Sequence, residues 1–138
     1  DDVEVLAKKF VKDHKNFLHL KPILLISGGE TTVKIKGKGK GGRNQEFALH
    51  FLRVINSLIP SISYTLLSAG TDGRDGPTNA AGAIVDDESL NLIHKKKIDL
   101  DKEINNNNSY EVLKKINSLV IINGTNTNVA DLQLLLIK

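Results

Sequence analysis

The spacing of apolar residues along the chain predicts alternating helical and extended segments. Residues 3–18 and 43–58 carry apolar side chains close to helical spacing, which predicts two helices. Residues 31–36 alternate between polar and apolar side chains, which predicts a strand with one exposed face. Short apolar runs predict four further strands, at residues 23–26, 63–70, 119–122 and 131–137. The runs at 23–26 and 119–122 are continuous, which is typical of buried strands.

The remaining segments are shorter and less regular. Residues 88–95 and 110–116 have the pattern of short helices, and Ser109 is expected to cap the second one. Residues 80–86 are mostly small, so a helix-like turn and a strand are both compatible with them. The asparagine run at residues 105–108 has low complexity and predicts a loop insertion.

The order of these segments predicts an α/β fold. We expect a single domain over residues 1–138, with helices packed on a mixed sheet and a leading helix within residues 1–20. The chain begins at Asp1 and contains no methionine. We therefore expect it to be a fragment of a longer chain from which a partner domain is missing.

Three polar loops follow predicted strands, at about residues 37–44, 71–79 and 123–128. The ends of strands are where α/β sheets place their ligands. If the strands share one sheet, the three loops gather at one rim of it. This arrangement favours a small anionic substrate over an extended polymer.

The first polar loop contains four glycines and two lysines and leads into the helix that begins at Arg43. Glycine lets the backbone approach a ligand closely, and the free N–H groups and dipole of a helix N-terminus favour a negative charge. The loop is therefore a candidate site for phosphate or carboxylate. A solvated basic turn is the alternative, with Gly42 or Asn44 as the helix cap and Glu46 simply favourable in the first turn.

The second polar loop holds two carboxylates three positions apart, Asp72 and Asp75, with Arg74 between them. The two carboxylates are suited to Mg²⁺, with waters and a substrate phosphate completing the coordination shell. They are equally suited to side-chain turns that close the loop without a ligand, and spacing alone favours this second interpretation.

Composition narrows the classes of partner. Aromatic residues make up 4% of the chain, which leaves few rings to stack on bases, and the net charge is only +3. We therefore expect no nucleic acid partner. Cysteine is absent, no apolar run reaches the roughly 18 residues of a membrane span, and no signal peptide opens the chain. These features favour a cytoplasmic protein without membrane contact.

Two kinds of chemistry fit the first loop. Its glycines match the spacing of a dinucleotide fingerprint, but no acidic residue follows about 20 positions later, as a ribose contact requires. Phosphoryl transfer to a small hydroxy acid needs cations near the phosphate and a carboxylate for Mg²⁺ or for base duty. The chain offers these types as Arg43 with Lys38 or Lys40, and as Asp72 or Asp75.

Three stretches carry long motifs. They are residues 28–33 (Gly-Gly-Glu-Thr-Thr-Val), 37–46 (Gly-Lys-Gly-Lys-Gly-Gly-Arg-Asn-Gln-Glu) and 70–83 (Gly-Thr-Asp-Gly-Arg-Asp-Gly-Pro-Thr-Asn-Ala-Ala-Gly-Ala). In this order they resemble the C-terminal MOFRL domain of class II glycerate kinases, whose relatives have often been labelled hydroxypyruvate reductases. Residues 124–132 fit the ending of that family, although residues 123–128 depart from its usual Gly-Pro-Thr-Gly-Thr-Asn-like loop. The asparagine run at 105–108 belongs to this chain alone.

The resemblance implies an ATP-dependent, Mg²⁺-requiring kinase that converts D-glycerate to 2-phosphoglycerate. Its active site would lie in a cleft between this domain and a larger N-terminal α/β domain, which supplies a catalytic lysine in the family. The isolated domain is expected to be inactive. An NAD(P)-dependent hydroxypyruvate reductase and a non-catalytic ligand-binding module are the alternatives, and a homodimer is left open.

The matching motif positions also imply roles for individual residues. Arg43 and Asp72 are expected to be catalytic, and Asp72 and Asp75 to be the metal ligands. Lys38 and Gly39 are expected to bind the nucleotide cofactor. The residues expected to contact the substrate are Lys40, Gly42, Asn44, Glu46, Asp75 and Asn79.

Overall fold

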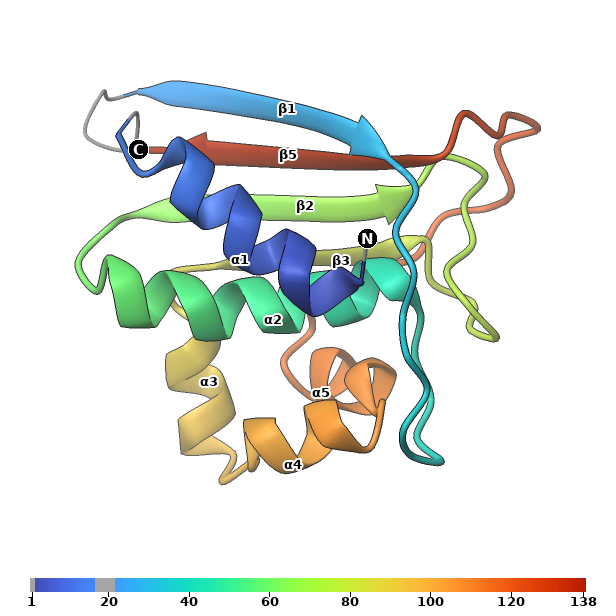
Figure 1. Ribbon diagram of the computed structural model, residues 1–138. Helices are drawn as coiled ribbons and strands as arrows, with labels where there is room; N and C mark the ends of the chain where they lie inside the picture. The colour runs from blue at the N-terminus through green and yellow to red at the C-terminus, as the bar shows by residue number, and fades with distance from the viewer. Residues whose placement is uncertain (1, 17–21) are drawn as a thin grey trace.

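The computed structural model describes residues 2–16 and 22–138, which form one sheet with helices packed on one of its faces (Figure 1). Along the chain the elements are α1 (Val3–His14), β1 (Ile23–Gly29), α2 (Arg43–Leu58), β2 (Tyr64–Gly70), β3 (Gly82–Asp86), α3 (Ser89–Lys95), α4 (Leu100–Asn105), α5 (Ser109–Lys115), β4 (Leu119–Val120) and β5 (Asp131–Ile137). No helix of this described part is long and apolar enough to cross a membrane.

The strands of the described residues form one sheet in the order β1-β5-β2-β3-β4. β5, the last strand of the chain, lies between β1 and β2, and its Leu135 is opposite Leu25 on one side and Leu66 on the other. The predicted α/β domain with helices packed on its sheet is confirmed. The sheet is antiparallel at each pairing of named strands where we expected a mixed one, because β5 runs opposite to both of its neighbours.

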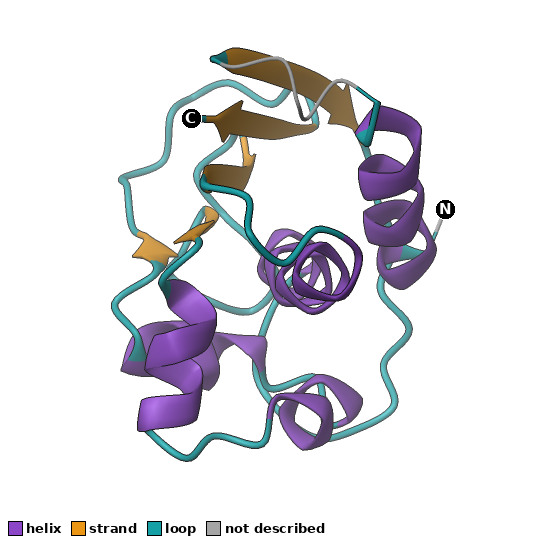
Figure 2. Ribbon diagram, turned by 90° about the vertical axis from the view of Figure 1, so that its left-hand side faces the viewer, coloured by secondary structure: helices purple, strands orange, loops and turns teal. Residues whose placement is uncertain are grey.

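α2 is the central element of the core. Figure 2 shows it end-on, between the sheet and the other helices. Its side chains Phe47 and Phe51 are fully buried and meet Phe10 of α1 edge to face, with ring centroids 5.9 and 6.3 Å apart. Burying each such ring stabilises the fold by roughly 1.5–3 kcal/mol. The core therefore fixes the position of α2, whose first turn points toward the polar loops.

Both long helices predicted from the sequence are present in the described residues. The helix predicted at residues 43–58 is confirmed as α2. The helix predicted at residues 3–18 is confirmed as α1 up to His14, and its final residues 17–18 lie outside the described residues. Residues 80–86, for which a turn and a strand were both open, contribute the strand β3.

The second face of the sheet carries no helix in the described part of the chain (Figures 1 and 2). Side chains alternate between the two faces along each strand. The outward positions form an apolar surface, here called the outer face, made of Leu24, Ile26, Leu67, Ile84, Leu134 and Leu136. The prediction that residues 23–26 form a buried strand is therefore wrong in its burial, because β1 is covered on one face only and Ile26 is 68% exposed.

The strand predicted at residues 31–36 is absent. In this segment only Thr32 makes a bridge, to Asp2, and the chain leaves the sheet after Gly29 to run beside the helices (Figure 1). The backbone N–H of Lys36 donates to the Asn107 side chain at 2.6 Å instead of to a strand. The alternating pattern was misleading because this segment pairs with no strand of the sheet, and its backbone contacts Asp2 and Asn107 instead.

Two other expectations near the C-terminal half are corrected. The buried strand predicted at residues 119–122 shortens to β4, Leu119–Val120, and Ile121 is 57% exposed because β3 offers pairing partners to two residues only. The asparagine run ends α4, which was not predicted, and its residues 106–108 form the short turn that leads into α5. Ser109 is the first residue of α5 and not its cap, and Asn108 takes the cap position.

Candidate functional site

The three polar loops meet at one end of the sheet, the right-hand end in Figure 1, and we call this region the rim. Asp75 of the second loop binds the first turn of α2, and Thr125 of the third loop donates through its backbone N–H to the carbonyl oxygen of Asp72 at 3.4 Å. The predicted gathering of the loops at one rim is therefore confirmed. The first loop arrives there from the irregular segment at residues 30–36 and not from a strand.

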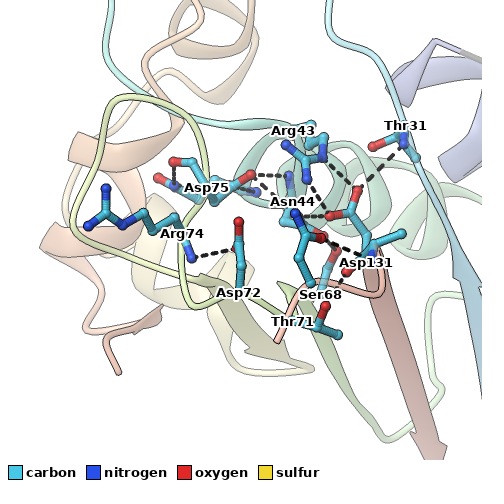
Figure 3. Close-up of polar contacts among 12 residues, drawn as sticks. Thr31, Arg43, Asn44, Ser68, Thr71, Asp72, Arg74, Asp75 and Asp131 are labelled. Carbon is cyan, nitrogen blue, oxygen red and sulfur yellow. Dashed lines mark hydrogen bonds and ion pairs between the residues drawn. The ribbon is translucent and has the colours of Figure 1, made fainter. Parts of the chain in front are cut away.

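Arg43, the first residue of α2, is fixed at the rim by Asp131 (Figure 3). Its Nε and Nη2 donate to the two carboxylate oxygens of Asp131 at 2.7 and 2.8 Å, a bidentate pair. The Asp131 side chain is fully buried, whereas the Arg43 side chain is 28% exposed. The hydrogen bonds to Asp131 hold the pKa of Arg43 above its ordinary value. The guanidinium is therefore a permanent, oriented positive charge with one side toward solvent.

Asn44 connects the two carboxylates beneath Arg43. Its side-chain nitrogen donates to Asp131 at 2.9 Å and to Asp75 at 3.3 Å, and its side-chain oxygen accepts from the Ser68 hydroxyl at 2.7 Å. Asn44 and Ser68 are fully buried. This network links α2 to β2 and β5. It therefore fixes the position of Asp131, which in turn holds Arg43 (Figure 3).

The Asp75 carboxylate caps the N-terminus of α2. Its oxygens accept the backbone N–H groups of Asn44 at 3.0 Å and Gln45 at 2.9 Å, and the Gln45 side chain donates a further bond at 3.0 Å. Burial raises the pKa of Asp75, and these hydrogen bonds oppose the rise. The negative charge that a helix N-terminus favours is thus supplied by the protein itself. Gly42 takes the N-cap position without a side-chain bond, as one of the two predicted candidates.

The glycine loop is held by the asparagine segment, residues 106–108. Asn107 accepts the backbone N–H groups of Lys36 and Gly37 at 2.6 and 3.0 Å, and the backbone oxygen of Asn106 accepts that of Gly39 at 2.8 Å. A side chain at Gly39 would lie 2.5 Å from that same oxygen. The glycines therefore let two backbone segments pack closely, and these N–H groups bind asparagine instead of pointing at a ligand.

A hollow of about 410 Å³ opens between the glycine loop and the second polar loop. This volume lies within the usual range for small-molecule sites. Its lining residues are Thr31, Thr32, Val33, Ile35, Gly39, Gly41, Gly42, Arg43, Glu46, Gly76, Pro77 and Asn107. Arg43 and Glu46 are the two ionisable groups of this lining, and most of the remaining surface is apolar.

Glu46 is a buried carboxyl group on the wall of the hollow. Its side chain is 2% exposed, and its Oε1 atom has no hydrogen-bond partner in the described part of the chain. Burial raises its pKa to about 7; the Asn107 and Ser109 side chains beside it partly oppose the rise without a well-formed bond to Oε1. His50 lies one turn further on, with its Nε2 3.8 Å from Oε2 of Glu46, and burial lowers the His50 pKa to about 4.

Four other predicted residues are not among those that line the hollow: Lys38, Lys40, Asp72 and Asn79. Asp72 is partly exposed and accepts the backbone N–H of Arg74 at 3.0 Å, the side-chain turn considered from the sequence. The ammonium group of Lys40 lies 4.6 Å from the centre of the Tyr110 ring, and the Tyr110 hydroxyl donates to Asn79 at 2.8 Å. Lys38 is exposed. Within residues 2–16 and 22–138, no group of three or more His, Asp or Glu side chains is placed to hold a metal.

Sequence reasoning missed Asp131 as a site residue. The segment was assigned only as the last strand, yet an acidic residue opens a mostly apolar run there. In β5 the alternation places Asp131 on the same buried face as Gln133 and Leu135. A carboxylate on the buried face of a strand needs a cationic partner, so this position signalled an ion pair.

The fold and the rim together define an α/β domain in which a buried carboxylate orients an arginine beside an open hollow. The MOFRL family model matches residues 23–131, and the chain belongs to this family. It is 48% identical over 109 residues to glycerate 2-kinase of Pyrococcus horikoshii, a match that covers 78% of this chain and 24% of that protein. It is also 48% identical over 112 residues to D-glycerate 2-kinase of Thermotoga maritima, covering 81% of this chain and 26% of the relative.

Solved structures agree with these matches. The crystal structure of glycerate kinase from Thermotoga maritima superposes with a TM-score of 0.88 at 39% identity, over 100% of this chain and 34% of that one. A protein of Pyrococcus horikoshii gives a TM-score of 0.84 at 38% identity, over 99% and 32%. The chain thus spans about a quarter of the length of the curated relatives it matches.

Proposed function

We propose that this chain supplies one half of a glycerate kinase active site, in which a phosphoryl group passes from ATP to D-glycerate to give 2-phosphoglycerate. The observation that carries the proposal is the Arg43 guanidinium, held by Asp131 at the edge of a hollow of about 410 Å³. Its relatives named as glycerate 2-kinases support the reaction.

Arg43 is proposed to neutralise the transferred phosphoryl group. Phosphoryl transfer is mainly positioning and charge neutralisation, because negative charge spreads over the phosphoryl oxygens in the transition state. Two of the five N–H donors of Arg43 bind Asp131, and within the described residues the remaining donors are available to a ligand. Asp131 and Asn44 hold the guanidinium in place beforehand, which lowers the cost of ordering it during the reaction.

Asp72 is proposed as the main protein ligand of Mg²⁺. Both oxygens of Asp75 accept hydrogen bonds at the N-terminus of α2, whereas Asp72 is partly exposed at the rim. Mg²⁺ is usually held by one or two carboxylates together with substrate phosphates, so a single rim carboxylate fits it. When bound, the ion would neutralise charge on the nucleotide phosphates. Lys38 and Gly39 are proposed to face the nucleotide, and Lys40, Gly42 and Asn79 to border the substrate.

A second wall is proposed to close the hollow. The hollow opens on the surface of the chain, and the relatives contain about three times as much sequence outside the matched region. We propose that an N-terminal α/β domain of the full-length protein covers the rim, and that the isolated chain binds substrate weakly without turnover. A homodimer and a cytoplasmic location are also proposed; light scattering and cell fractionation test them.

The test is an assay of the full-length protein with ATP, Mg²⁺ and D-glycerate, followed as ADP release and 2-phosphoglycerate formation. We expect Arg43→Ala to lower kcat/KM by about 100- to 1,000-fold, the usual loss of an oriented charge-stabilising group. Arg74→Ala, at an exposed arginine of the same rim, is the matched control and should retain activity.

Other outcomes separate the alternatives. Saturable NADH binding with hydroxypyruvate-dependent oxidation, and no ADP release, would replace the kinase by a reductase. Full turnover in Arg43→Ala would make the chain a non-catalytic ligand-binding module. Sustained kinase activity of the isolated 138-residue chain would contradict the need for a second domain.

A further inference from the structure

Glu46 is a buried ionisable residue beside the hollow, and the hydrogen bonds of the fold do not account for its carboxyl group. Glu46 is 2% exposed, and its Oε1 has no hydrogen-bond partner in the described part of the chain. The Asn107 and Ser109 side chains lie beside the carboxyl group and lower its pKa, but neither forms a well-aligned hydrogen bond to Oε1. Leaving a buried polar atom without a partner costs about 1–3 kcal/mol, so such an atom calls for a ligand or a reaction that uses it.

The position of Glu46 connects it with Arg43. The two residues are three positions apart at the start of α2, where side chains lie on the same helical face with Cβ atoms roughly 5–6 Å apart. Both line the same hollow. A small molecule seated there would meet a positive charge at one point and a carboxyl group about one helical turn away.

The surroundings of Glu46 suit proton transfer near neutral pH. Burial is the main reason that its pKa rises to about 7; the Asn107 and Ser109 side chains oppose the rise, the charge of Asp75 adds to it, and Lys36 opposes it. His50, on the same helix, has its pKa lowered to about 4 and is therefore neutral beside the carboxyl group at neutral pH. A general base is most effective when its pKa lies near the working pH.

We propose that Glu46 is the general base of the reaction, a role that rests on the kinase function proposed above. The hydroxyl oxygen of the acceptor attacks the γ-phosphorus of ATP and a new P–O bond forms. The bond from that phosphorus to the β-phosphate oxygen breaks, and ADP leaves. The acceptor's hydroxyl proton passes to the Glu46 carboxylate and is afterwards released to water. Asp72 is not among the residues that line this hollow, and it accepts a backbone N–H.

The test uses the full-length protein and measures kcat/KM for D-glycerate against pH. The wild type should lose activity below an apparent pKa near 7, as Glu46 becomes protonated. Glu46→Gln should lose about 100- to 10,000-fold in kcat/KM at neutral pH, keep its KM for ATP, and show no loss toward acid pH. Glu46→Asp should recover part of the rate, because it restores a carboxylate at a shorter reach.

Each result has a defined meaning. Glu88→Gln, at an exposed carboxylate of the turn before α3, is the matched control and should behave as the wild type. A Glu46→Gln enzyme within ten-fold of the wild type, or one that keeps the acid loss, overturns the base assignment alone. A wild-type rate that is flat from about pH 5.5 to 8 overturns it even if the variant does not fold. A wild type without glycerate-dependent ADP release overturns the kinase function itself.

Discussion

At the scale of single residues, Asp75 decides what the N-terminus of α2 can do. Its carboxylate accepts two backbone N–H groups of the first turn, so an internal side chain fills the position that a bound anion often takes at a helix start. An incoming phosphate is therefore left to Arg43, whose guanidinium is oriented by Asp131. The start of α2 thus holds Arg43 in position, and Arg43 is the residue that would contact the phosphate.

Asp75→Asn should destabilise the fold. One of the two capping oxygens becomes an N–H₂ group facing a backbone N–H donor, and the charge at the helix N-terminus is lost. We expect the free energy of unfolding to fall by about 2–3 kcal/mol in urea denaturation. Asp87→Asn, at an exposed carboxylate, should change it by less than about 0.5 kcal/mol. Equal effects of the two variants would contradict the capping role.

Glu46 makes stability depend on pH. Its pKa is raised from 4.5 to about 7, so the folded state holds this proton more tightly than the unfolded chain does. The resulting stabilisation is complete below pH 4.5 and is lost as the pH rises through 7. We expect unfolding measurements to show that Glu46→Gln reduces the loss of stability over this window, by on the order of 3 kcal/mol.

His50 gives stability a pH dependence of the opposite sign, so the contributions of His50 and Glu46 can be told apart. Its pKa is lowered from 6.5 to about 4, so its contribution is present above pH 6.5 and is lost as the pH falls through 4. The two windows overlap between pH 4.5 and 6.5 but have opposite signs, so His50→Gln should remove a loss of stability toward acid pH, whereas Glu46→Gln removes a loss toward alkaline pH. If Glu46→Gln leaves the slope between pH 4.5 and 7 unchanged, Glu46 does not carry that dependence.

The sequence predicted the motif residues of the site better than their roles. Arg43 was expected at the ligand; it lines the hollow, and its contact with a ligand stays a prediction. Its partner Asp131 was missed, because a contact across 88 positions depends on how β5 packs and not on local pattern. The glycine loop was expected to face an anion, yet much of its backbone binds asparagine side chains, which local composition does not reveal.

At the scale of elements, the glycine loop and the asparagine segment form one unit. Asn107 has a backbone φ of 53°, a left-handed conformation that asparagine tolerates better than most residues. Its side chain accepts the N–H groups of Lys36 and Gly37 and donates to the Lys34 carbonyl oxygen at 3.1 Å. An apparent low-complexity run thus fixes one wall of the hollow.

Gly39→Ala should loosen this wall. The added methyl group would lie 2.5 Å from the Asn106 carbonyl oxygen, so one of the two backbone segments must move. We expect a loss of about 1–3 kcal/mol in the free energy of unfolding and a lower melting temperature. Gly29→Ala is the matched control, because a methyl group there meets no atom within 4 Å. The same melting temperature for both variants would show that the loop does not pack as described.

The elements with long, regular patterns were predicted well. α2 and the strands β2 and β5 have enough apolar periodicity to outweigh local exceptions. The segment at residues 31–36 has a strand pattern but no neighbouring strand, and hydrogen-bond partners across the sheet decide whether a strand forms. β1 has the continuous apolar pattern of a buried strand, while one of its faces is open.

At the scale of the whole molecule, the outer face is notable for its exposed apolar side chains. Leu24 and Ile26 are 52% and 68% exposed, and their cross-strand neighbours on β5 are Leu136 and Leu134. An antiparallel sheet with one solvated face usually carries polar side chains there. Contiguous apolar surface on a soluble chain promotes association.

We expect the isolated chain to self-associate as its concentration rises, through the outer face. Ile26→Lys should shift sedimentation or light-scattering profiles toward the monomer, because a charged group then interrupts the apolar surface. Leu58→Lys is the matched control: this leucine is 49% exposed but lies at the end of α2, away from the sheet. Equal self-association of the wild type and both variants would contradict this use of the outer face.

The placement of β5 has a consequence for how the protein is made. Residues 131–137 pair with β1 on one side and β2 on the other, so the interior of the sheet is completed only after residues 23–130 have been synthesised. Until residues 131–137 follow, the nascent chain holds β1 and β2 without their shared neighbour, and Arg43 without its carboxylate. Sheet assembly and charge pairing therefore wait for this late segment, when contacts between distant parts of the sequence form together.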